Sequence, residues 1–171
     1  MADEIADRAF EDPITTTIVN FLIDVGLDVR SGEIAERTFL PGIMIEQGTL
    51  RIDEAKLKYP GDLLHEAGHL ALIPPSRRKE VHVDVGKSAG EEMGAIAWSY
   101  AALVHLHLDP AIVFHAGGYR GGSTALIYNF ATGHYIGVPM LQWLGLTAAH
   151  KLARELDVAP YPNMLKWLRG E

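Results

Sequence analysis

Cysteine is absent from this chain of 171 residues, and its absence narrows the chemistry that the chain can perform. Without cysteine there are no disulfides, no thiolate-bound zinc, no iron–sulfur cluster and no thiol catalysis. Any metal ion must therefore be held by histidine and carboxylate side chains.

An excess of positive charge is also missing, as are long apolar runs. The 15 Lys and Arg against 22 Asp and Glu give a formal charge of −7. This charge argues against a nucleic-acid partner, because general nucleic-acid binding needs a basic surface. The longest apolar stretch, about residues 93–104, is too short to span a bilayer, and the acidic first twelve residues lack the apolar segment of a signal peptide. We therefore expect a soluble, cytoplasmic protein with neither a membrane nor a nucleic acid as partner.

The residues that are present fit one domain over 1–171. Asp12 followed by Pro13 predicts the start of a helix that ends near Gly26. Alternating apolar residues on both sides of Gln47-Gly48 predict a hairpin over about 43–53, and a further strand is expected at 81–85. Periodicity predicts further helices at about 62–73, 90–107, 110–115, 123–130, 139–144 and 148–156, and a terminal turn at 163–169. The predicted fold class is α+β, mostly helical, with a small β-sheet near the N-terminal third.

The segment LLHEAGHLAL carries the motif that matters most. On a helix, His65 and His69 are four residues apart and project from the same face, so both imidazoles can reach one zinc ion at roughly 2 Å. Glu66 flanks the position of a zinc-bound water, where a general base belongs. The alternative is a pair of histidines without a metal, but each buried imidazole would then need a hydrogen-bond partner of its own. The motif therefore predicts a zinc-dependent hydrolase.

HEAGHLAL, with a hairpin before it and a glutamate-bearing helix after it, resembles the HExxH zincin metallopeptidases. Within them it is similar to the gluzincins, whose third ligand is a glutamate on the following helix. A metzincin would continue with glycine and a third histidine, whereas this chain continues LALIPP. The layout is also similar to the minimal zincin cores of the ImmA/IrrE kind. The resemblance covers about residues 43–105, the expected metal core, and leaves the helical part at about 109–171 without a match.

The resemblance implies that Glu91 or Glu92 is the third Zn²⁺ ligand. Glu92 shares a helix stripe with Ile96 and Ser99, which we expect to face inward, whereas Glu91 shares one with residues 95 and 98. We favour Glu92, and both remain candidates. Two exposed glutamates that favour the helix dipole are the alternative.

One departure from the gluzincin pattern concerns the group that orients a ligating histidine. Gluzincin peptidases often place an aspartate four residues after the ligand glutamate, but Ala95 and Ile96 occupy those positions here. A backbone carbonyl or Asp84 is expected to take this role.

Catalysis also needs a donor for the developing oxyanion. The candidates in or near the glycine-rich segment GGYRGGS are His115, Tyr119, Arg120, His134 and Tyr135. The same segment could instead be only a tight connection with an exposed arginine. It lacks the GK[ST] ending of a phosphate-binding loop. The three tryptophans, by contrast, are expected in the core because they stand among Leu and Ala at helical spacing.

These residues together predict a zinc metallopeptidase that acts on a peptide or protein, with the strand at 49–53 pairing with an extended substrate. The alternative is a non-catalytic zinc-binding sensor or interaction domain built on the same core. An open fourth coordination position would favour the enzyme, and a fourth protein ligand would favour the module. A third reading is a helical interaction protein in which HEAGH is accidental. Nothing in the sequence indicates an oligomeric state.

Overall fold

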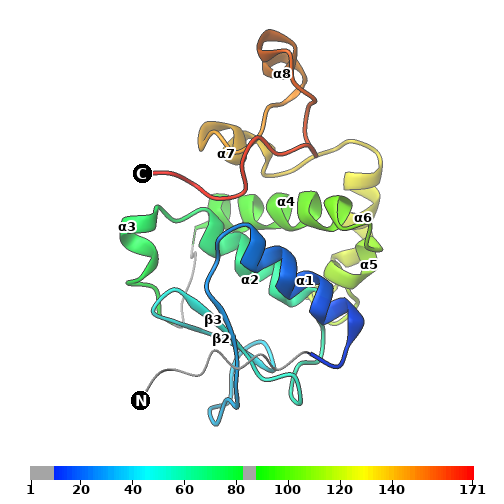
Figure 1. Cartoon of the computed structure of the whole chain (residues 1–171). Coiled ribbons are helices and arrows are strands. Elements are labelled where there is room, and N and C mark those ends of the chain that lie inside the picture. The colour runs from blue at the N-terminus through cyan, green and yellow to red at the C-terminus, as the bar shows by residue number, and fades with distance from the viewer. Residues whose placement is uncertain (1–9, 83–87) are drawn as a thin grey trace.

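Three short strands form a small mixed sheet near the N-terminal third of the chain, and helices make up the other regular elements (Figure 1). The computed structural model describes residues 10–82 and 88–171. β3 (Thr49–Ile52) lies between β1 (Val29–Ser31), to which it is parallel, and β2 (Ile43–Glu46), to which it is antiparallel. The α+β, mostly helical fold class is thus confirmed, and β1 is an element that the sequence did not predict.

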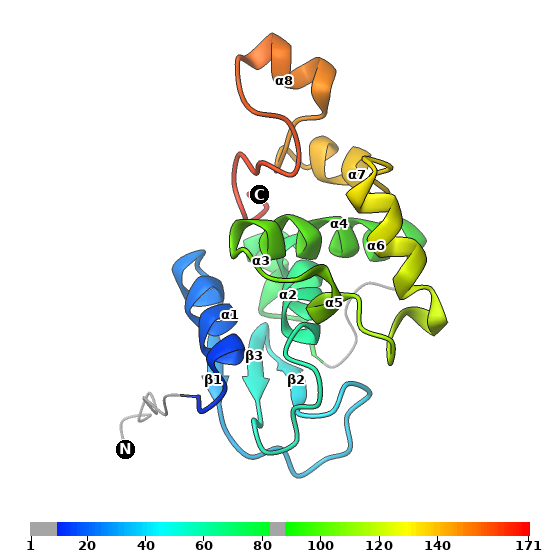
Figure 2. The same cartoon turned by 90° about the vertical axis from the view of Figure 1, so that its right-hand side faces the viewer.

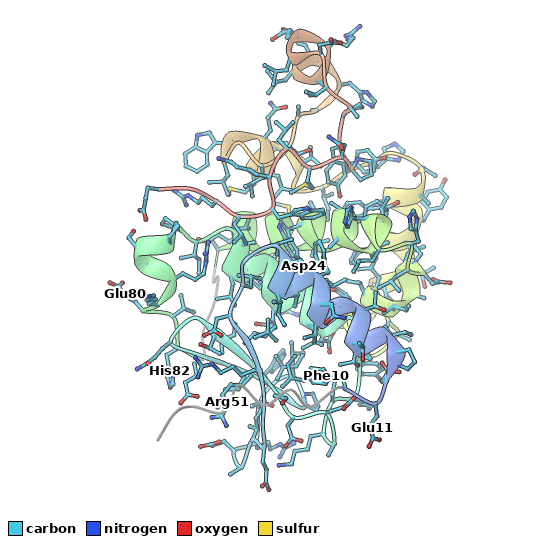
Figure 3. The ribbon with its side chains drawn as sticks, in the orientation of Figure 1. Phe10, Glu11, Asp24, Arg51, Glu80 and His82 are labelled. Atoms are coloured by element: carbon cyan, nitrogen blue, oxygen red, sulfur yellow. The ribbon has the colours of Figure 1, made fainter. Side chains whose placement is uncertain are left out.

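The hairpin turn has the expected residues. Gln47 and Gly48 both have positive φ, 50° and 79°, as the favoured two-residue hairpin turn requires. The Gly48 N–H donates to the carbonyl of Val81, so the neighbouring His82 lies beside this turn, as Figure 3 shows. Val81 and His82 belong to no strand, and the rest of the strand expected at 81–85 lies outside the described residues.

The predicted helices are confirmed with ends shifted by a few residues. They are α1 (Pro13–Asp24), α2 (Asp62–Ala71), α4 (Ala89–His105), α5 (Pro110–Val113), α6 (Ser123–Ala131), α7 (Val138–Trp143) and α8 (His150–Leu156). The short α3 (Pro75–Arg78) and the 3₁₀ turn η1 (Tyr119–Gly121) were not predicted. Residues 163–169 form no helix. Within the described residues, none of these helices combines the length and apolar character needed to cross a bilayer.

α1 begins at Pro13, as the sequence predicts. The Asp12 carboxylate accepts the N–H of Thr15 at 2.7 Å, and Pro13 follows at the first helical position. Its buried face, which includes Ile18 and Leu22, packs beside α2 (Figure 2). α1 therefore covers the helix that carries the HEAGH motif.

The contact between α2 and α4 is the one that positions the site. A Cβ added to Gly68 would lie 2.8 Å from the carbonyl oxygen of Ala95, so only glycine lets the two backbones approach this closely. Gly68 thus serves helix packing by facing α4. The approach brings the first turn of α4 over the histidines of α2.

The C-terminal part stacks on the other side of α4, where α7 and α8 lie away from the sheet (Figure 1). Trp98 is fully buried and its indole N–H donates to the Trp167 carbonyl at 2.8 Å. Trp143, however, is 77% exposed at the end of α7, so the expectation that it belongs to the core is wrong. The Arg169 N–H donates to the Ala71 carbonyl at the end of α2, so the last residues fasten onto the motif helix.

Candidate metal centre

His65 and His69 converge as their spacing on α2 requires. Their Nε2 atoms lie 3.2 Å apart, and the two rings are nearly perpendicular, at 89°. His69 is buried and His65 is nearly so, with 4% and 12% of their side chains exposed. Two imidazole nitrogens thus point at one place from one helix face.

Glu92 reaches the same place from α4. Its carboxylate oxygens lie 3.3 Å from Nε2 of His65 and 3.1 Å from Nε2 of His69. The hydrogen bonds from His65 and His69 hold the pKa of the Glu92 carboxyl well below its usual range. Burial lowers the pKa of His65, but the hydrogen bond and charge of Glu92 outweigh this, and the net shift is upward.

Glu91 is directed elsewhere. Its carboxylate accepts the hydroxyl of Ser88 at 2.9 Å, while the Ser88 side chain accepts the N–H of Glu91 at 3.1 Å. This reciprocal pair is a capping box at the start of α4. The Ser-x-x-Glu spacing of Ser88 and Glu91 was the sequence signal that separates the two glutamates.

The distances of the His65, His69 and Glu92 group fit a bound metal ion. Ligand atoms about 2.0–2.1 Å from a tetrahedral zinc ion lie about 3.3 Å from one another. The two Nε2 atoms are 3.2 Å apart, and Glu92 approaches them at 3.3 and 3.1 Å through its two different oxygens. One ligand atom from each of the three residues lies within 4.8 Å of the others. Among the described residues, this is the one group of three His, Asp or Glu side chains close enough to share an ion.

A histidine that binds a metal through Nε2 is usually oriented by a hydrogen bond at its other ring nitrogen, Nδ1. The Nδ1 atoms of His65 and His69 are buried without a hydrogen-bond partner among the described residues. The backbone carbonyl expected to orient one of them is therefore not found in this part of the chain. Asp84, the other expected group, lies outside the described residues.

Glu66 lines the same cavity as the metal-binding group. Burial raises the pKa of its carboxyl, the nearby His65 and His69 oppose that shift, and the carboxylates of Glu92 and Asp62 reinforce it. No hydrogen bond or ion pair occupies the Glu66 side chain within the described residues. A carboxylate placed in this way is available to accept a proton.

Tyr119 faces the metal-binding group from the far wall. Its ring meets that of His65 edge-on, with centroids 5.7 Å apart, and its hydroxyl is buried without a partner among the described residues. Burial raises the pKa of Tyr119, and the carboxylates of Asp62, Glu92 and Glu66 add to the shift. Tyr119 and Arg120 both have φ near +50°, a backbone conformation that is strained for residues other than glycine. Such strained residues occur often at functional sites.

His115 is tightly packed in the same wall of the cavity. Its Nε2 lies 2.7 Å from Oδ1 of the buried Asp62, and its ring stacks on Tyr59 with centroids 3.7 Å apart. Burial raises the pKa of Asp62, although the hydrogen bond from His115 opposes the shift. A Cβ added to Gly118 would lie 3.1 Å from Cε1 of His115, and one added to Gly117 would lie 2.5 Å from the Tyr59 hydroxyl. The two glycines therefore allow this close packing around His115.

The remaining oxyanion candidates lie in different places. Arg120 is exposed and lines the cavity, whereas His134 and Tyr135 do not line it. His134 is exposed beside Thr132, and Tyr135 packs edge-on against Tyr161 in the core. The structure therefore does not bring His134 and Tyr135 to the metal-binding group. Sequence reasoning also missed Asp62 and Tyr59, because their partner His115 is more than fifty residues away in the chain.

The cavity that holds these groups, called the cleft below, has a volume of about 1050 Å³. Its walls come from residues 36–41, β2, residues 58 and 59, Asp62 and the α2 motif, His82, Glu92, and residues 115 and 117–120. All four residues of β2 line the cleft and none of β3 does. Because β3 is paired on both sides, the expectation that strand 49–53 pairs with a substrate is wrong, and β2 is the edge strand of the sheet within the described residues.

Comparison of the chain with family models, with curated proteins and with solved structures finds no match. The geometry of the cleft is therefore what any functional assignment rests on.

Proposed function

We propose that the chain is a zinc-dependent hydrolase that cleaves peptide bonds in a peptide or protein substrate. The observation that carries the proposal is the convergence of His65, His69 and Glu92 in an open cleft beside a carboxylate with no partner among the described residues, Glu66. No fourth protein ligand joins the group within the described residues. Catalytic zinc sites keep one position open in this way, whereas structural sites are closed by four protein ligands.

When bound, zinc supplies Lewis-acid polarisation of a carbonyl and lowers the pKa of water to about 7. Glu66 takes the proton from the attacking water and delivers it to the leaving amide nitrogen. Tyr119 is the oxyanion donor, because its buried hydroxyl lacks a partner in the described part of the chain and faces the metal-binding group. His115, held by Asp62 through Nε2, packs beside Tyr119 on the same wall and helps to position it.

The edge of β2 that faces away from β3 has no partner strand among the described residues, and it is suited to hold an extended peptide. Glu46 and Thr49 close the two-residue hairpin and therefore form a hydrogen-bonded pair, so the next pair, Ile45 and Leu50, is of the other kind. The N–H and C=O of Ile45 then point away from β3 and toward a strand added at the edge. A peptide paired with β2 would lie in the cleft, because every residue of β2 lines it.

Glu66→Gln tests the proposal, with Glu91→Gln as the matched control. Each protein is loaded with zinc, its metal content is measured, and it is incubated with a pool of peptides whose cleavage is followed by mass spectrometry. Glu66→Gln should keep zinc and lose at least 100-fold in cleavage rate, because general acid–base catalysis contributes about 10²–10⁴-fold. Glu91→Gln should match the wild type, because Glu91 only caps α4. Undiminished cleavage by Glu66→Gln, or a wild type that binds no zinc, would refute the proposal.

The second candidate is a non-catalytic zinc-binding sensor or interaction domain. The observation in its favour is that the buried Nδ1 atoms of His65 and His69 lack described partners, whereas ligating histidines are usually oriented through that nitrogen. Acetohydroxamate added to the cobalt-loaded protein distinguishes the two. A change in the visible spectrum indicates an exchangeable coordination position and favours the enzyme, and an unchanged spectrum favours the module.

A further inference from the structure

Three exposed cations line the cleft and have no acidic partner among residues 10–82 and 88–171. Arg37, Lys58 and Arg120 all line the cleft, and all three are exposed. None of them forms an ion pair with any residue that the structure describes. Three such cations in one cleft are unexpected in a chain with a formal charge of −7, and a role in binding an anionic ligand would explain them.

The acids of the cleft are, in contrast, mostly engaged inside the protein. Glu46 pairs with Arg51 at 2.9 Å, and Asp62 with His115 at 2.7 Å. Glu92 is held by the two histidines of the metal-binding group. Glu36 and Glu66 are the lining acids that have no partner within the described ranges. The three cations are therefore opposed by two lining acids that are free of partners in the described part of the chain, and a zinc ion bound at the floor would add further positive charge.

Two of the cations are placed by the aromatic wall. Lys58 Nζ lies 5.2 Å from the centroid of the Tyr59 ring, the same ring that stacks on His115. Arg120 directly follows Tyr119, and its own backbone is held in the left-handed region at φ 51°. These cations therefore belong to the wall that faces the metal-binding group.

The third cation comes from a different segment, the loop between β1 and β2. This loop carries Arg37 and the fully exposed Phe39, and both residues line the cleft. Figure 2 shows the loop that enters β2 and the segment between α5 and α6 on the same side of the molecule, one below the other. A ligand in the cleft thus meets positive charge from both segments.

We propose, resting on the proposed function, that the substrate is an acidic peptide segment, rich in Asp and Glu, bound through Arg37, Lys58 and Arg120. A single exposed ion pair contributes little to affinity. Several cations of one sign around one cleft raise the local concentration of an anionic ligand and select against a cationic one. The same charges fit a peptide whose side chains extend from the outer edge of β2 toward both walls.

Binding of labelled ten-residue peptides of glutamate, glutamine or lysine tests the inference, measured by fluorescence anisotropy with zinc-free and zinc-loaded protein at low ionic strength. The glutamate peptide should bind at least tenfold more tightly than the glutamine peptide in both forms, and the lysine peptide should bind most weakly. The variant combining Arg37→Gln, Lys58→Gln and Arg120→Gln should lose about tenfold in affinity for the glutamate peptide, the combined effect of three exposed pairs.

The matched control changes three exposed cations of the C-terminal part by the same net charge: Lys151→Gln, Arg154→Gln and Lys166→Gln. This control should stay within twofold of the wild type. An equal loss in both triple variants, or no preference for glutamate in the wild type, overturns the inference. Lys58→Gln alone, with circular dichroism to verify folding, supplies the same comparison if the triple variant is unstable; an affinity equal to the wild type then overturns the inference.

The zinc-free arm keeps this inference separable from the hydrolase proposal. If Glu66→Gln still cleaves peptides while the cleft variant loses glutamate binding, the catalytic assignment fails and the substrate class stands. If Glu66→Gln is inactive but glutamate is not preferred, the substrate class fails and the hydrolase stands.

Discussion

Replacing Glu92 by alanine, with Glu91→Ala as its neighbour and control, tests the metal site most directly. The two glutamates are adjacent in the first turn of α4, yet one contacts His65 and His69 and the other contacts Ser88. Only Glu92→Ala should therefore change the response of the protein to zinc.

The size of the effect follows from linkage. Groups that only orient a ligand are worth about 10–100-fold in metal affinity, so loss of the ligand itself should cost at least 100-fold. At free zinc 100 times the wild-type Kd, binding stabilises the folded state by about 2.7 kcal/mol, and a 100-fold weaker site retains about 0.4 kcal/mol. For a chain of this size about 1 kcal/mol corresponds to roughly 2–4 °C, so zinc should raise the wild-type Tm by about 5–11 °C and that of Glu92→Ala by about 1–2 °C.

Without zinc the two variants should resemble each other. The Glu92 side chain is 45% exposed, so its contacts with the histidines contribute under about 1 kcal/mol. Loss of the Glu91 half of the capping box should cost roughly 0.5 kcal/mol. Thermal unfolding at a buffered free zinc concentration measures both quantities. A full zinc response in Glu92→Ala, or its loss in Glu91→Ala, would show that the assignment of the third ligand is wrong.

Three further predictions concern packing, pH and the far wall of the cleft. Gly68→Ala places a Cβ 2.8 Å from a backbone oxygen of α4. Urea titration should therefore show that the free energy of unfolding falls by about 1 kcal/mol or more, although alanine has the better helix propensity. An unchanged free energy of unfolding would contradict the close approach of the two helices. The buried Asp53 carboxylate accepts the Ile34 N–H at 3.0 Å, which lowers its pKa. The contribution of Asp53 to stability is thus complete above about pH 4 and is lost as the pH falls through the lower pKa of the folded state. The wild type should therefore lose more stability than Asp53→Asn between about pH 5 and 2. Parallel pH–stability curves would refute this. Gly118→Ala should displace His115 and lower peptide cleavage about tenfold while zinc affinity is unchanged, and a parallel fall in zinc affinity would contradict this separation.

α2 and its histidine pair could be predicted from the sequence because the residues that define them lie close together in the chain. The i, i+4 spacing of His65 and His69 needs only helical geometry to make the two rings converge. Choosing between the glutamates was harder, because α4 is buried on nearly every side between residues 94 and 103. Ala95, on the stripe of Glu91, is as buried as Ile96 on the stripe of Glu92, so the stripe argument alone does not discriminate. The capping box does, because a glutamate engaged at the N-cap is not free to bind a metal.

The parts that could not be predicted are those made by distant residues. β1 has three residues and pairs in parallel with β3 some twenty residues later, so no local alternation announces it. The contact of Asp62 with His115 spans 53 residues, and the stacking of Tyr59 on that histidine depends on the same long-range closure. Tyr119 was a candidate on loop placement alone, and only the folded chain sets its ring against His65.

The two sides of the cleft are built by separate contacts, and this division bears on the choice between an enzyme and a metal-binding module. On one side, the approach of α2 and α4 at Gly68 brings Glu92 to the histidines. On the other, Tyr59 and Gly118 hold His115 between them, next to Tyr119. A module that only binds zinc needs the first set of contacts and gains nothing from the second. Hydrolysis needs both, because the substrate carbonyl must meet the metal on one face and fixed hydrogen-bond donors on the other. The positive φ of Tyr119 is a cost to stability of the kind that accumulates at functional sites, so it favours the proposed enzyme over the module.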